Sequence, residues 1–140
     1  MTKIIIDALG ADAGAKMVAL AIQSALKKRA FSCVVVGPSS VLAPVLGDYK
    51  QVEIVDTSTY IRNDESPVFA IRRKKEASLV LAFSHLNAGG DVLLSGGRTG
   101  ALLAGGYFLT KRIEGMERMC LVPTIPNVHG GILLADAGAT

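Results

Sequence analysis

The 140-residue sequence contains no tryptophan, four phenylalanines and three tyrosines. Exposed aromatic side chains supply the stacking platforms on which single-stranded nucleic acids bind. The net charge is only +3 at pH 7, whereas proteins that bind a phosphate backbone carry a strongly basic patch. The composition therefore argues against a nucleic-acid partner, although a mildly basic chain remains compatible with small anionic ligands.

Cysteine is also scarce, and long apolar runs are absent. Cys33 and Cys120 have no metal-ligand spacing and lie in apolar stretches, so we expect two buried, reduced thiols and no metal site. The first residues, MTKIIIDALGAD, lack the apolar region of a signal peptide. No segment reaches the roughly 18 uninterrupted apolar residues that a membrane span needs. These absences predict a cytoplasmic protein.

Hydrophobic residues and glycine are abundant instead. Half of the residues are hydrophobic, 19% are charged, and 15 are glycines that separate apolar runs. A chain of this length and composition can bury one ordinary core, so we predict a single α/β domain over residues 1–140.

The apolar runs predict strands at residues 3–8, 31–36, 51–55, 91–94, 119–125 and 132–135. Helical periodicity and end signals predict helices at residues 15–29, 39–46, 67–88 and 99–110. Because strands alternate with helices and are apolar throughout, they are typical of a parallel sheet covered on both faces. We therefore predict a three-layer α/β/α sandwich with a mostly parallel, doubly wound sheet.

The stretch SGGRTG follows the fourth predicted strand and precedes a predicted helix, where sheets of this kind bind ligands. Glycines let successive N–H groups converge on an anion, hydroxyls donate to it, and a guanidinium pairs with it. The stretch matches neither a Walker loop nor a dinucleotide-binding motif. It predicts an anion site; the alternative is a tight turn that needs glycine only for its shape. The site residues would be Ser95, Gly96, Gly97, Arg98, Thr99 and Gly100.

Acidic residues also occur at predicted strand ends. Asp7 and Asp136 each end a strand, and Asp12 lies in the first loop. Their carboxylates could position a cation, a hydroxyl or a loop in a binding site. The alternative is that they cap neighbouring N–H groups.

Four consecutive cations, RRKK, begin at Arg72 within the predicted helix over residues 67–88. At most two of them can share a helix face, so one interpretation is a solvated helix face. The other is that one or two of them, with Arg72 and Lys75 as the candidates, aim at the strand-end cleft and hold an anionic substrate or a carrier protein. His129 is a weak candidate in a glycine-containing loop, and His85 is expected to be structural. No Ser-His-Asp or Cys-His arrangement is visible, which disfavours a covalent nucleophile.

Taken in order, several segments resemble the PlsX family, the bacterial phosphate acyltransferases of phospholipid synthesis. The resemblance covers residues 5–139 through IDALGAD, NDESPVFAIRRKKEASLVLA, LLSGGRTGALLAGGYFLTKRIEGMER, LVPTIP and LLADAGA. It implies a fold like that of the isocitrate and isopropylmalate dehydrogenases. It implies an enzyme that needs no cofactor and makes acyl phosphate from inorganic phosphate and an acyl group on acyl carrier protein. It further implies a homodimer, with possible peripheral association at the inner membrane face.

The sequence also departs from the family pattern. Arg98 stands where the family has an asparagine, and Thr140 replaces another. Family members are considerably longer, which implies that the chain corresponds to their N-terminal portion, and the resemblance identifies no catalytic side chain. Two alternatives therefore stay open: a related short-chain phosphotransacylase, such as a component of glycine reductase, and a non-catalytic binding fragment.

Overall fold

A computed structural model of the chain describes residues 1–117 and 119–135. The chain divides into two compact units, Met1–Thr110 and a second that begins at Lys111. Asp136, one of the predicted site residues, lies outside the described residues.

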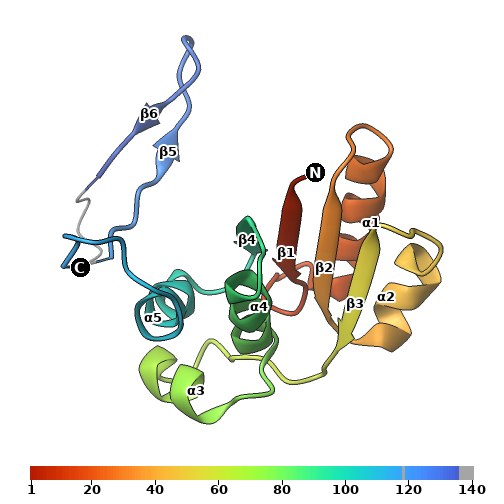
Figure 1. The fold of residues 1–140 in the computed structure, drawn as a ribbon, viewed down its shortest axis with the longest axis horizontal. Helices are drawn as coiled ribbons and strands as arrows, with labels where there is room; N and C mark the ends of the chain where they lie inside the picture. Colours follow the sequence, from red (N-terminus) through yellow and green to blue (C-terminus); the bar gives the residue numbers. More distant parts are fainter. Residues whose placement is uncertain (118, 136–140) are drawn as a thin grey trace. The chain divides into compact units, whose positions relative to one another are not determined.

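The first unit is built on a four-stranded parallel sheet, as predicted. Its strands are β1 (Lys3–Asp7), β2 (Ser32–Gly37), β3 (Val52–Asp56) and β4 (Val92–Ser95), arranged in the order β3-β2-β1-β4 (Figure 1). The chain thus runs outward from β1 to β3 and then returns to the other side of β1. The order reverses between β1 and β4, which is where open α/β sheets bind ligands.

Helices cover both faces of this sheet. They are α1 (Gly14–Leu26), α2 (Ser39–Leu46), α3 (Pro67–Arg73), α4 (Ser78–Asn87) and α5 (Thr99–Leu109). Alternate residues of a strand point to opposite faces: Ile6 and Val35 pack in one cluster with α1 and α2, whereas Ile5 and Val34 pack with α4. Burying each of these side chains contributes about 1.5–3 kcal/mol. The sheet therefore lies between two helical layers.

The single helix predicted over residues 67–88 was wrong, because α3 and α4 are separate helices with a break at residues 74–77. The hydroxyl of Thr57 donates to the carbonyl of Glu76 at 2.7 Å, and the N–H of Ser78 donates to the carbonyl of Thr59 at 2.9 Å. The segment that follows β3 thus satisfies backbone groups that a continuous helix would have paired internally.

The two last predicted strands are much shorter in the structure and lie outside the four-stranded sheet. β5 (Thr124–Ile125) and β6 (Ile132–Leu133) form an antiparallel pair in the second unit, and His129 lies in the turn between them. Cys33 is buried and Cys120 is exposed, so the expectation of two buried thiols was wrong for Cys120, whose segment does not enter the sheet. No helix within residues 1–117 and 119–135 is long and apolar enough to cross a membrane.

Candidate functional site

The site begins at the carboxyl ends of β1 and β4, where Asp7 and Ser95 are register partners. The side chain of Ser95 donates a hydrogen bond to Asp7 Oδ2 at 2.8 Å, and the N–H of Leu9 donates to Asp7 Oδ1 at 3.3 Å. Ser95 Oγ in turn accepts the N–H of Gly97 at 3.1 Å. Asp7 is only 3% exposed, so its carboxylate is committed to joining the two loops, in agreement with the capping alternative.

The loops after β1 and β4 touch through their backbones at two glycines. A Cβ atom on Gly10 would lie 2.7 Å from Asp7 Oδ2 and 2.9 Å from the Cα of Gly97. Both distances are too short for a real side chain. Glycine is therefore required at position 10 for this close approach of the two loops. Anion binding by Ser95–Gly100 stays a prediction.

A cavity of about 560 Å³ opens beside this crossing, a volume within the usual range for small-molecule sites. The first loop, the segment after β3 and one residue of the β4–α5 turn line it. These lining residues are Leu9, Gly10, Ala11, Asp12, Tyr60, Ile61, Arg62, Asn63, Asp64 and Arg98. The cavity thus lies at the point where the strand order reverses.

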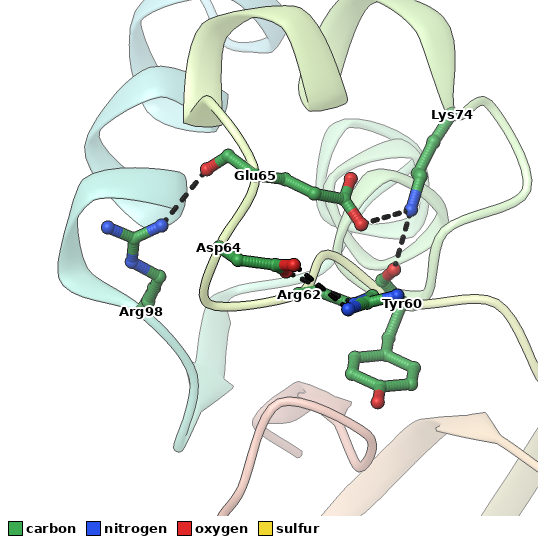
Figure 2. Close-up of polar contacts among 6 residues, drawn as sticks. All are labelled: Tyr60, Arg62, Asp64, Glu65, Lys74 and Arg98. Atoms are coloured by element: carbon green, nitrogen blue, oxygen red, sulfur yellow. Dashed lines mark hydrogen bonds and ion pairs between the residues drawn. The ribbon is translucent and has the colours of Figure 1, made fainter.

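The outer wall of the cavity, Tyr60–Asp64, and the adjoining Glu65 are held in place by side chains from the β4–α5 turn and from the α3–α4 break (Figure 2). Lys74 Nζ lies 2.6 Å from Glu65 Oε1 and donates to the carbonyl of Tyr60 at 3.3 Å. From the other side, Arg98 donates to the carbonyl of Glu65 at 3.0 Å. The wall is therefore held from two sides, by the α3–α4 break and by the β4–α5 turn.

Two ion pairs of the wall differ in their surroundings. The Lys74 and Glu65 side chains are 33% and 25% exposed, whereas those of Arg62 and Asp64, 2.9 Å apart, are 62% and 65% exposed. Exposed pairs contribute little to stability because water and salt screen them. Lys74 is thus the better candidate for holding the wall.

Some of the predicted site residues line a cavity, and others lie next to it in the strand or helix. Asp12 and Arg98 line the large cavity, and Asp7, Gly97 and Arg98 line an adjoining hollow of about 10 Å³. Ser95 is the last residue of β4, Gly96 follows it in the β4–α5 turn, and Thr99 and Gly100 begin α5.

Arg72 and Lys75 do not line either of these hollows. The guanidinium of Arg72 lies 4.5 Å from the ring centroid of Phe108, near the C-terminal end of α5 and away from the turn that contains Arg98. Lys75 is exposed in the α3–α4 break.

The wall residues Tyr60–Asp64 were not among the predicted site residues. The available signal was their position: they form a polar, irregular segment that follows the carboxyl end of β3. Segments at that edge of a parallel sheet contribute to its ligand site.

The parallel four-stranded sheet and its helices define an α/β protein, with a cavity at the point where such folds bind ligands. Comparison with known proteins identifies the family. The model of a family of fatty acid synthesis proteins matches residues 2–140. The chain therefore belongs to the PlsX family of phosphate acyltransferases, as the resemblance implied.

Three relatives show the extent of the similarity. The chain is 40% identical over 143 residues to the phosphate acyltransferase of Clostridioides difficile (strain 630) and 41% identical over 140 residues to that of Bacillus cereus (strain B4264). It is 37% identical to that of Anoxybacillus flavithermus. The matches cover 98% of this chain but only 42%, 42% and 43% of the relatives.

Proposed function

We propose that the chain acts in the transfer of an acyl group from acyl carrier protein to inorganic phosphate, which produces acyl phosphate. The observation that carries this proposal is the cavity of about 560 Å³ at the point of reversal, with Arg98 at its edge, in a chain that belongs to the phosphate acyltransferase family.

The reaction needs no protein nucleophile. A phosphate oxygen attacks the thioester carbonyl carbon, a C–O bond forms, the C–S bond breaks, and the carrier thiolate takes up a proton. The protein's task is to hold the anion beside the carbonyl, to stabilise the oxyanion that develops, and to limit access of water. Arg98 and the N-terminal end of α5 are the groups of this chain that suit an anion. No catalytic side chain is assigned.

The direct test is to incubate the chain with inorganic phosphate and palmitoyl acyl carrier protein and to trap acyl phosphate as its hydroxamate. Hydroxylamine also attacks thioesters, so a reaction without phosphate is the control. Phosphate-dependent hydroxamate supports the proposal, and its absence at high enzyme concentration contradicts it for this chain. A binding role without catalysis, the third possibility, would then remain.

A second candidate is a phosphotransacylase for short acyl groups. Arg98 stands where the family has an asparagine and spans from the β4–α5 turn to the Glu65 carbonyl, so its larger side chain occupies space at the edge of the cavity. Comparing acetyl with palmitoyl thioesters in the same assay separates the two candidates.

Several further features of the family are proposals for this chain. They are a sheet of the isocitrate and isopropylmalate dehydrogenase type, residues 1–140 working as one domain of a longer family fold, a homodimer, and a cytoplasmic location with peripheral contact at the inner membrane face. The strand order β3-β2-β1-β4 supports the first of these.

A further inference from the structure

One surface of the first unit combines exposed aromatic side chains with two cations. It consists of Val68, Phe69, Arg72 and Arg73 of α3 and Tyr107 and Phe108 of α5, and we call it the Arg–Phe face. Its apolar members are substantially exposed: Phe69 is 63%, Tyr107 43%, Val68 41% and Phe108 38% exposed. Several large apolar side chains that share an exposed surface mark an interaction site more often than isolated ones do.

Ring contacts hold the cations of this face in position. The guanidinium of Arg72 lies 4.5 Å from the ring centroid of Phe108, and that of Arg73 lies 5.7 Å from the ring of Phe69. Phe108 in turn meets Tyr107 edge to face, with ring centroids 5.0 Å apart. A stacked guanidinium keeps the N–H groups on its edge available for a carboxylate. The ring contacts thus restrain both guanidinium groups without neutralising their charge.

The balance of charge on this face is positive. Among the residues that the structure describes, neither Arg72 nor Arg73 forms an ion pair, whereas the neighbouring Lys74 pairs with Glu65. A hollow of about 230 Å³ runs beside Phe69 and Arg73 and is lined by Glu65, Ser66, Ala70 and Lys74 as well. The face therefore offers a mostly apolar hollow bordered by the unpaired Arg73, with the unpaired Arg72 on the same face.

The Arg–Phe face also adjoins the candidate site. Glu65 lines the hollow, its side chain pairs with Lys74, and its carbonyl accepts a hydrogen bond from Arg98, which lines the large cavity. A partner bound in the hollow would therefore contact the outer side of the cavity wall.

We propose that the Arg–Phe face docks an acidic helix with an apolar strip, presented by the carrier protein that brings the acyl group; the identity of the partner rests on the proposed function. The apolar strip packs on Phe69 and Val68, and carboxylates beside it form bidentate contacts with Arg72 and Arg73. Opposite charges also speed the encounter.

Two other occupants fit the face less well. An anionic membrane is recruited by clusters of about 4–8 cations, and the Arg–Phe face presents two unpaired ones beside a hollow. A second copy related by two-fold symmetry would bring the same face against itself, so arginines would oppose arginines.

The test measures binding of an acidic acyl carrier protein without its prosthetic group, labelled with a fluorophore, to the 140-residue chain by fluorescence anisotropy. Omitting the prosthetic group separates docking from catalysis. Arg72→Glu with Arg73→Glu should weaken binding by roughly tenfold or more, and Phe69→Ala should weaken it as well. The matched control is Lys27→Glu with Lys28→Glu, an equal charge change at an exposed position beyond α1, and it should change binding by less than about twofold.

Circular dichroism and thermal melting establish that each variant is folded. Should the charge-reversed pair unfold, Arg72→Gln with Arg73→Gln replaces it, with an expected loss of roughly threefold or more. Equal losses in the control pair, or no binding by the parent chain, would overturn the proposal. Two further results would overturn it. One is that the chain binds phosphatidylglycerol vesicles but not the carrier protein. The other is that the chain forms a dimer that is lost only in the Arg72 and Arg73 variants.

The outcomes also separate docking from the proposed reaction. Carrier binding that depends on Arg72 and Arg73, without formation of acyl phosphate, would support docking and contradict the reaction. If the charge-reversed pair forms acyl phosphate with an unchanged KM for the acylated carrier, the reaction is supported and docking at the Arg–Phe face is contradicted.

Discussion

The hydroxyl of Ser95 donates to the carboxylate of Asp7 at 2.8 Å, although the two residues are 88 positions apart in the sequence. This hydrogen bond joins the two strands between which the sheet order reverses. The candidate site therefore depends on a part-buried polar contact whose acceptor, Asp7, is itself buried.

Replacing Asp7 with alanine should destabilise the chain by about 1–3 kcal/mol, because the Ser95 hydroxyl and the Leu9 N–H would lose their buried acceptor. Urea denaturation measures the change. Asp12→Ala is the control, since Asp12 is an exposed carboxylate of the same loop, and it should change the free energy of unfolding by less than about 0.5 kcal/mol. Equal effects of the two substitutions would contradict the importance of this contact.

Arg98→Ala should weaken the binding of inorganic phosphate by about 1.5–3 kcal/mol, the range for a hydrogen bond to a charged group. Isothermal titration calorimetry with phosphate measures this. Arg62→Ala is the matched control, because Arg62 lines the same cavity but is paired with Asp64. Unchanged affinity in Arg98→Ala would contradict a role in anion binding, and equal losses in both variants would show that only the net charge of the cavity matters.

Lys74→Ala should loosen the cavity wall, since Lys74 holds both Glu65 and the carbonyl of Tyr60. Hydrogen exchange at residues 60–66 should become faster, while exchange in β1 and β2 stays unchanged. Lys75→Ala, a substitution of the exposed neighbouring lysine, should have no effect. If the two variants exchange alike, the ion pair does not hold the wall.

Joint replacement of Arg73 and Lys74 by alanine should raise the KM for acyl carrier substrates and flatten its salt dependence, with little change in the KM for phosphate, because surface charge acts mainly on the encounter. In this chain Lys74 also supports the wall, so Arg73→Ala alone is the cleaner variant. A rise in the phosphate KM with Arg73→Ala would place Arg73 in the anion site instead. If neither the KM for the acyl carrier nor the KM for phosphate changes, Arg73 belongs to a solvated helix face.

The two thiols should differ in reactivity. Burial raises the pKa of Cys33 from 9.0 to about 11, and its side chain is 2% exposed, whereas Cys120 is exposed. An aromatic disulfide reagent at neutral pH should therefore modify Cys120 quickly and Cys33 only after unfolding. Rapid modification of both thiols in the folded chain would contradict this.

The raised pKa of Cys33 also predicts a dependence of stability on alkaline pH. Because the folded pKa lies above the unfolded one, the stabilising contribution is complete below pH 9.0 and is lost as the pH rises through about 11. The difference in unfolding free energy between the parent chain and Cys33→Ala, measured from pH 8 to 11, isolates this contribution. A difference that stays constant over this range would contradict the assignment.

The sequence predicted the sheet well because the runs that form β1, β2, β3 and β4 are apolar enough to be recognised without tertiary information. It did not predict the break at residues 74–77, where no glycine or proline interrupts the helical pattern. The break depends on hydrogen bonds from Thr57 and Ser78 to distant carbonyls. The cavity wall was missed for a similar reason: the contacts of Lys74 and Arg98 with residues 60–65 join segments whose proximity only the fold creates.

The hydrogen bond between Thr57 and Glu76 has a consequence for how the family can be engineered. Residues 57–76 leave the body of the fold and return to it at nearly one point, so they form a closed excursion that carries both the cavity wall and α3. An excursion with neighbouring ends can be exchanged between relatives when the contacts of α3 with α5, those of Ile71 above all, are kept. Transplanting it would transfer the outer rim of the site and one side of the docking surface as a single module.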